Sequence, residues 1–368
     1  MKTKSGFMIS KAGIIVTGAV IGVLAALLVK LGNPANMGVC VACFERDIAG
    51  ALGLHRAAAV QRLRPEIPAF ILGSFVASLL AREWKPRTGS APLARFVLGA
   101  FSMIGALVFL GCPWRAWLRL AGGDWNAVFG LLGLFAGVLV GIVFLKRGYS
   151  LGRNHAAPAA LGFVMPAIAL GLLALAVVMP LFGRGADGQA IGPIFTSASG
   201  PGSMAAPIAV SLAVGLVIGY LAQRSRFCTV GAVRDLVLFR DPHLMLGLLS
   251  LFAAALVTNL ALGQFKLGFA GQPVAHTDGL WNFGGMALSG LAFTLAGGCP
   301  GRQLFLSGEG DADAGVFVLG MITGAAFAHN FNLASSAAGP SPYGPAATIV
   351  GLVVVAVIGL AFREKAAE

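Results

Sequence analysis

Long apolar runs separated by short polar or glycine-rich segments make up almost the whole chain. A run of about 20 apolar residues is what an α-helix needs to cross the hydrocarbon core of a bilayer, where it must satisfy its own backbone hydrogen bonds. The pattern therefore predicts an all-α polytopic membrane protein with about ten spans. The spans lie near residues 12–30, 67–81, 94–111, 126–145, 156–182, 205–222, 243–264, 283–298, 314–331 and 344–362.

The composition agrees with this interpretation and leaves no chain for a sizeable soluble domain. Of the 368 residues, 57 % are hydrophobic and 11 % are charged, and the mean hydropathy is +0.86. The first span follows several lysines and lacks a small-residue cleavage site. We therefore interpret it as a retained helix of a protein that begins at Met1.

The basic residues set the expected orientation. If both termini are cytoplasmic, most Lys and Arg side chains fall into cytoplasmic loops, as the positive-inside rule requires of a multi-pass protein of the bacterial inner (cell) membrane. The net charge of +12 then reflects loops that face anionic lipid, which argues against nucleic-acid binding. The five tryptophans lie at or near proposed span ends, where the indole N–H can stay in the interfacial region.

Two cysteine motifs each occur twice, in the same order. The sequence Gly-Cys-Pro-Trp-Arg at 111–115 recurs as Gly-Cys-Pro-Gly-Arg at 298–302, and Cys-x5-Arg-Asp occurs at 40–47 and at 228–235. This indicates a tandem duplication. We expect a first membrane repeat at 1–183, a flexible linker rich in Gly, Ser, Ala and Pro at 184–204, and a second membrane repeat at 205–368.

Each repeat holds five predicted spans, and an odd number makes the second copy enter the membrane in the opposite sense. Inverted repeats are typical of transporters, whose substrate path lies at the repeat interface. With a cytoplasmic N-terminus, Cys40 and Cys112 approach this path from outside, and Cys228 and Cys299 approach it from inside.

Cys112 and Cys299 each end an apolar span and precede a proline, which is favoured at the first position of a helix. We expect both cysteines to be N-cap residues of short re-entrant helices, where free N–H groups and the helix dipole attract anions and lower a thiol pKa. Arg115 and Arg302 share the helical face of these cysteines and are the candidate substrate-binding residues.

Cys40 and Cys228 also open short segments, 41–52 and 229–239, that cannot cross a bilayer. The pairs that follow them are candidates for bracing the loops: Arg46 with Asp47, and Arg234 with Asp235. Cys43 has no counterpart, because Gly231 occupies its place, and with Cys40 it forms a CxxC that is a candidate redox pair.

Less specific interpretations compete with these. A single membrane cysteine is usually a small hydrophobic residue, although four of them in duplicate are hard to explain that way. Arg119 is as readily an interfacial anchor as a functional residue, and Asp124 and Asp311 are expected to cap the helices that follow them. The five histidines are scattered without metal-ligand spacing, so neither a metal nor another cofactor is expected.

The paired motifs resemble those of the YeeE/YedE family of membrane proteins, which transport sulfur compounds such as thiosulfate. Two runs in the first half, at 36–44 and 52–56, most resemble the YedE-related branch associated with selenium metabolism. The resemblance implies that Cys40, Cys112, Cys228 and Cys299 relay the substrate along the pore. It also implies a small cytoplasmic sulfur-carrier protein as a partner.

We therefore expect a transporter that imports a small sulfur- or selenium-containing anion through a cysteine-lined pathway, and not an enzyme. No Asp or Glu lies well inside a proposed span, so the usual carboxylate for ion coupling is missing. One alternative is a membrane thiol-disulfide oxidoreductase that uses Cys40 and Cys43. Another is a general anion channel, which would leave the cysteines without a role.

Overall fold

The computed structural model describes residues 6–178, 183–184, 190–191 and 193–363. The lysines before residue 6, the residues after 363 and part of the predicted linker lie outside the described residues, as does the end of the predicted span 156–182. Within the described chain, nine helices are long and apolar enough to cross a membrane. They are α1 (Lys11–Lys30), α4 (Pro92–Phe109), α6 (Asn126–Lys146), α7 (Ala159–Val178), α8 (Ile208–Ser225), α10 (His243–Ala261), α11 (Gly279–Ala296), α13 (Ala312–Asn330) and α14 (Gly344–Ala361).

A further apolar helix, α3 (Glu66–Leu80), is shorter, with 15 residues, and corresponds to the remaining predicted span. The protein is therefore an all-α polytopic membrane protein, as predicted. Four short helices complete the bundle: α2 (Val41–Ala51), α5 (Pro113–Ala121), α9 (Thr229–Phe239) and α12 (Pro300–Gly308). The minor elements are η1 (Phe7–Ile9), η2 (Ala58–Val60), η4 (Pro201–Ser203), and the strand pairs β1 (Arg87–Thr88) with β2 (His155–Ala156) and β3 (Gly183–Arg184) with β4 (Ala190–Ile191).

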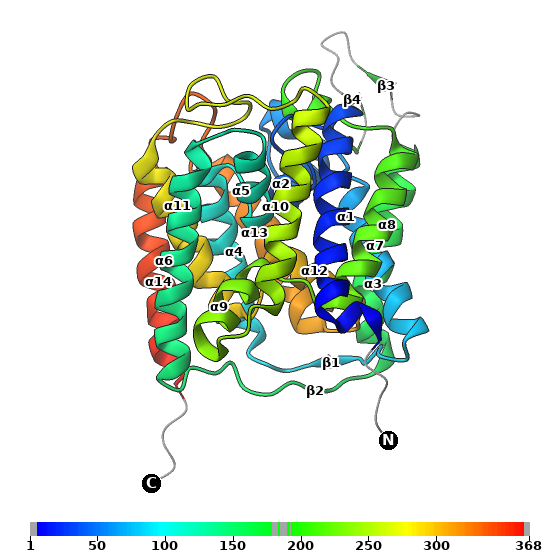
Figure 1. Ribbon diagram of the computed structural model, residues 1–368, viewed down its shortest axis with the longest axis vertical. Coiled ribbons are helices and arrows are strands. Elements are labelled where there is room, and N and C mark those ends of the chain that lie inside the picture. Colours follow the sequence, from blue (N-terminus) through cyan, green and yellow to red (C-terminus); the bar gives the residue numbers. More distant parts are fainter. Residues whose placement is uncertain (1–5, 179–182, 185–189, 192, 364–368) are drawn as a thin grey trace.

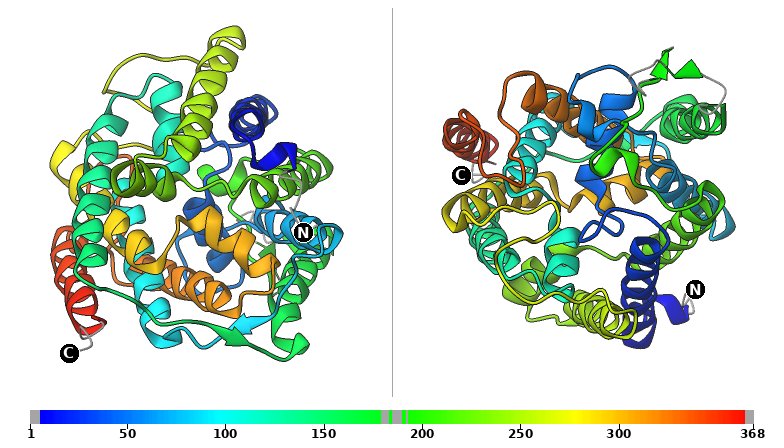
Figure 2. Two further views of the ribbon diagram at one scale, coloured as in Figure 1. Left: turned by 60° about the horizontal axis from the view of Figure 1, so that its bottom comes forward. Right: turned by 90° about the horizontal axis from the view of Figure 1, so that it is seen from above.

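The short helices enter the bundle from its two ends. In Figure 1, α2 and α5 lie in the upper half of the molecule, and α9 and α12 lie in the lower half. Figure 2 agrees, since α9 and α12 come forward when the lower end is turned to the viewer. Three residues separate each of α5, α9 and α12 from the long helix before it, whereas ten residues separate α2 from α1. The cysteine that precedes each short helix is buried, so the N-terminus of each lies inside the protein.

Helices of the two halves pack closely in equivalent pairs. Helix α6 lies against α11 and α13 lies against α4, while α1 lies against α10 and α3 lies against α8. Glycines allow the contact, because a Cβ at Gly133 would lie 2.1 Å from the Phe283 carbonyl oxygen, and one at Gly320 would lie 2.2 Å from that of Phe96. Small residues at such crossings let membrane helices approach at backbone distance.

The last helix of each half breaks this pattern. Helix α7 packs on α3 and α12, whereas α14 packs on α4 and α11. The loops that lead to α4 and α11 remain comparable, since each is fastened to the turn after a short helix. In the α3–α4 loop (residues 81–91), the Lys85 N–H donates to Glu309 O; in the α10–α11 loop (residues 262–278), the Lys266 N–H donates to Gly122 O.

The described part of the predicted flexible linker is fastened to the first half. The N–H groups of Phe195 and Ser197 donate to the carbonyls of Ala51 and Gln61, and the Arg64 guanidinium donates to the carbonyls of residues 201 and 204. Residues 193–204 thus have polar partners in the 51–64 loop, and the flexibility of the linker stays a prediction. Composition alone did not reveal those partners.

Candidate functional site

The first-half site contains three thiols at the start of two short helices. Cys40 is the N-cap of α2, and its sulfur accepts from the Cys43 N–H at 3.3 Å. The sulfurs of Cys40 and Cys43 are 2.8 Å apart. Cys112, the N-cap of α5 as predicted, places its thiol beside that of Cys40. All three are free and buried.

The second-half site repeats this arrangement with two thiols. Cys228 is the N-cap of α9, and its sulfur accepts from the Gly231 N–H at 3.2 Å. Cys299 is the N-cap of α12, and its thiol lies beside that of Cys228. Gly231 thus makes the same backbone contact as Cys43 without supplying a sulfur.

Backbone N–H groups from two helices converge on one sulfur in each site. Those of Ala42 and Arg115 lie near the Cys112 sulfur, and those of Thr229 and Arg302 lie near the Cys299 sulfur. The first turn of a helix has N–H groups without intrahelical partners and carries the positive end of the dipole. Two such ends beside one soft sulfur suit a small anion that carries a soft atom.

The two candidate binding arginines have different surroundings. Arg115 is fully buried and donates to three backbone carbonyls and, at 3.3 Å, to the Cys43 sulfur. Arg302 is 15 % exposed, and its Nη1 lies 3.4 Å from a carboxylate oxygen of Glu309. Within the described part of the chain, no carboxylate contacts Arg115, whereas Arg302 shares Glu309 with Arg87 and Arg226.

The Arg-Asp pairs lie beside the sites. Arg46 contacts Asp47 at 2.7 Å, and Asp47 also accepts from Arg64, a residue that the sequence analysis did not single out. Arg234 and Asp235 are likewise 2.7 Å apart but more exposed. The signal for Arg64 is hard to see from sequence, because its carboxylate partner is 17 positions away.

Arg119 is not an interfacial anchor. It is fully buried, and its Nε donates to Asp124 at 2.6 Å. Asp124 also accepts from the Asn126 N–H at the start of α6, and Asp311 is the N-cap of α13. Both acids thus serve the following helix, and Asp124 additionally compensates a buried charge.

An aromatic cluster around Trp114 lies beside residues of both sites, and the sequence did not reveal it. Trp114 is completely buried, with ring centroids 6.2 Å from Phe70, 5.6 Å from Phe227 and 6.1 Å from Phe305. Its motif counterpart Gly301 lies directly against it, since a Cβ there would be 3.1 Å from the Trp114 ring. The interfacial placement predicted for Trp114 is wrong, because α5 turns its N-terminus inward.

Two further features were not expected from the sequence. Glu45 on α2 is fully buried, and neither carboxylate oxygen has a hydrogen-bond partner. The rings of His55 and His329 have centroids 4.5 Å apart and are tilted by 33°, and His55 also contacts the Arg46 carbonyl. No Asp or Glu lies well inside a predicted span, but the short helix α2 carries the buried acid Glu45.

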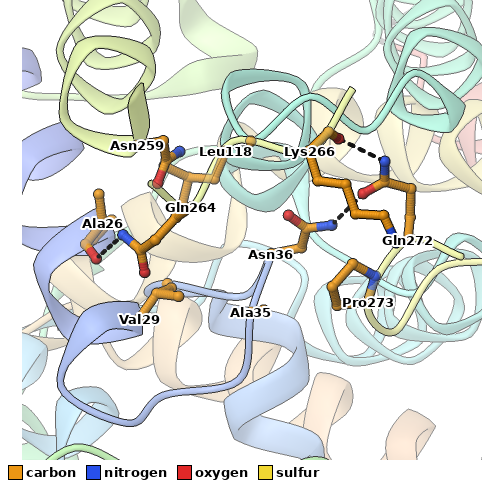
Figure 3. Close-up of a pocket in the computed structure, with 13 residues that line it drawn as sticks. Ala26, Val29, Ala35, Asn36, Leu118, Asn259, Gln264, Lys266, Gln272 and Pro273 are labelled. Carbon is orange, nitrogen blue, oxygen red and sulfur yellow. Dashed lines mark hydrogen bonds between the residues drawn. The ribbon is translucent and has the colours of Figure 1, made fainter. Parts of the chain in front are cut away.

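A cavity of about 180 Å³ lies next to the first-half site. Figure 3 shows side-chain amides around it, from Asn36, Asn259, Gln264 and Gln272, with Lys266 at its edge. Asn36 connects the cavity with the site, because its carbonyl accepts from Arg115 Nε at 2.9 Å.

Fold and site together define a polytopic helical membrane protein with buried thiols at the N-termini of short helices. Residues 224–363 match the family model described as "Sulphur transport". This region contains both cysteine motifs of the second half. The match supports the family resemblance that the sequence suggested, and the selenium-associated branch stays a prediction.

One similar protein is named as a thiosulfate transporter. The chain is 33 % identical over 99 residues to the thiosulfate transporter TsuA of Spirochaeta thermophila. The aligned stretch covers 27 % of this chain and 29 % of that protein, so the chain matches less than a third of the relative's length.

Proposed function

We propose that this protein is a transporter that imports a small sulfur-containing anion across the membrane, and that it is not an enzyme. The observation that carries the proposal is the pair of buried thiol sites at helix N-termini, with one aromatic cluster beside residues of both. Thiols attract the soft sulfur of the substrate, and N–H groups and guanidinium attract its charge. The family match and the thiosulfate relative support this choice of substrate class.

We further propose that residues 1–183 and 205–368 are inverted repeats joined by 184–204. The equivalent helix pairs and the entry of short helices from opposite ends support this arrangement. The first-half site then faces the outside and the second-half site faces the cytoplasm, with cytoplasmic termini in a bacterial inner membrane. A membrane-impermeant thiol reagent applied outside should label Cys112 before Cys299. Labelling of Cys299 alone would contradict the orientation.

The anion is expected to bind Cys40 and Cys112 first and Cys299 and Cys228 afterwards. No covalent step is required, because each thiol can donate a hydrogen bond to the substrate sulfur. Trp114 and its aromatic neighbours close the path between the sites, so open passage of ions is prevented. On the cytoplasmic side, a small sulfur-carrier protein is the expected acceptor, and a selenium analogue is a second candidate substrate.

Uptake by reconstituted protein tests the proposal. Liposomes containing the protein should accumulate labelled thiosulfate, with sulfate as the matched anion that lacks a soft terminal atom. Selenium oxyanions added as competitors distinguish a sulfur substrate from a selenium one. Equal transport of sulfate and thiosulfate would indicate a general anion channel and contradict a role for the thiols.

A thiol-disulfide oxidoreductase is the second candidate function. The separation of 2.8 Å between the Cys40 and Cys43 sulfurs favours it, because the two could form a disulfide after a small movement. The second half has no such pair, which favours transport as the shared function. A Cys43→Ser variant that lost all thiosulfate uptake would favour the redox alternative.

A further inference from the structure

Arg115 is held by three carbonyls that come from three separate segments, and each belongs to a residue in the left-handed region. Its Nε donates to Asn36 (φ 61°) at 2.9 Å, Nη1 donates to Leu110 (φ 64°), and Nη2 donates to Val274 (φ 49°) at 2.9 Å. Asparagine tolerates this conformation, whereas a β-branched valine rarely adopts it. The contact between Arg115 and Val274 therefore holds a backbone that would relax elsewhere.

The second-half site is built differently. Gly297 occupies the position equivalent to Leu110, and glycine adopts its φ of 89° without a steric penalty. Arg302 contacts the Glu309 carboxylate. Among the described residues, the meeting of three carbonyls with positive φ at one arginine is thus a feature of Arg115 that Arg302 does not share.

An anion can also replace the Val274 carbonyl as an acceptor of Arg115. The partners of Arg115 are neutral carbonyls and a thiol, and a guanidinium binds an anionic oxygen more strongly than a neutral one. Leu110 lies at the end of α4, inside the helix bundle. Val274 lies in the α10–α11 loop, beside Pro273 in the wall of the cavity that Figure 3 shows.

We propose that the hydrogen bond between Arg115 and Val274 is the latch of an anion-operated gate formed by residues 270–276 of the α10–α11 loop. The inference rests on the proposed transport function and deepens it. An anion that reaches the cavity takes the Nη2 donor from Val274, Val274 leaves the left-handed region, and the loop moves off the first-half site. Loss of the hydrogen bond between Arg115 and Val274 is offset by relief of the backbone strain at Val274. The gate therefore opens when an anion binds Arg115, and it stays closed when no anion is present.

Variants that relieve the strain should tighten the latch. Val274→Gly and Val274→Asn adopt a positive φ more easily, so the closed state gains stability and the anion competes less well. We expect the KM for thiosulfate uptake to rise about threefold at an unchanged maximal rate. The matched control is Leu267→Ala in the same loop, which is 63 % exposed and should keep the wild-type KM. A wild-type KM in both Val274 variants would overturn the latch.

Hydrogen exchange separates failure of the latch from failure of the transport proposal. In purified protein without any anion, amides of 270–276 should exchange more slowly in both Val274 variants than in wild type, after correction for intrinsic rates. Added thiosulfate should speed their exchange in wild type, with chloride as the control. Unchanged exchange in the variants overturns the latch even where uptake is normal. If wild type transports no thiosulfate, the transport proposal fails, and the anion-free comparison still decides the latch.

Discussion

The two cysteine sites begin with nearly the same motif and have different surroundings. The first has three thiols and a fully buried Arg115, which donates to the Cys43 sulfur and is held by neutral carbonyls. In the second, two thiols lie near a partly exposed Arg302 that shares Glu309. In both cases a cysteine is the N-cap of a short helix. A few side-chain differences then decide how strongly each site can attract an anion.

The largest effect should come from what the two sites share. Replacing Cys112 or Cys299 with Ser keeps the N-cap geometry and removes the polarizable sulfur. If the thiols act in series, each single variant should abolish thiosulfate uptake by liposomes, and the double variant should be no worse. Wild-type elution in gel filtration controls for folding. Wild-type uptake by both serine variants would show that the sulfurs are structural.

Substitution of the two arginines should then have different effects on stability at the two sites. Arg115→Lys loses the planar fork and leaves at least one buried carbonyl without a donor, so we expect the free energy of unfolding to fall by about 2–4 kcal/mol. Arg302→Lys keeps its charge at a partly exposed ion pair and should cost at most ~1 kcal/mol. Thermal unfolding in detergent measures both. Equal losses would contradict the difference between the surroundings.

The contact between Trp114 and Gly301 allows a sharper test of the centre. A methyl group at residue 301 would lie 3.1 Å from the Trp114 ring, so Gly301→Ala should destabilise the protein by about 1–3 kcal/mol. Adding Trp114→Phe makes room, and the double variant should be more stable than the sum of the single effects predicts. Thermal unfolding of wild type, both single variants and the double variant measures this. If the two losses in the free energy of unfolding simply add, residue 301 and Trp114 are not in contact.

The smallest effect is expected at the thiol that only the first site has. Cys43→Ser should leave most thiosulfate uptake intact, because Gly231 makes the equivalent N–H contact to a cysteine sulfur in the second half without supplying a thiol. The paired variant Cys40→Ser should lose uptake if Cys40 belongs to the relay. Loss in Cys43→Ser as complete as that in Cys112→Ser would instead indicate an essential dithiol.

Most of the fold could be predicted because a helix that crosses a lipid bilayer needs about 20 mainly apolar residues in a row. The predicted spans correspond to helices within a few residues, and proline after Cys112 and Cys299 correctly indicated where α5 and α12 begin. The partners of those helices could not be predicted. Arg64, Glu45 and the aromatic neighbours of Trp114 carry no motif, and their burial depends on segments that are distant in sequence.

The sequence by itself determined the helices, the recurring motifs and the cysteines at helix starts, because hydrophobic length and proline preference act locally along the chain. Only the tertiary structure decided which charges meet. It buried Arg119 against Asp124, placed Trp114 on Gly301, and turned three left-handed carbonyls toward Arg115. Most of these contacts join segments that are distant in the sequence, and burial in a low-dielectric interior makes each polar group depend on the partner that packing brings to it.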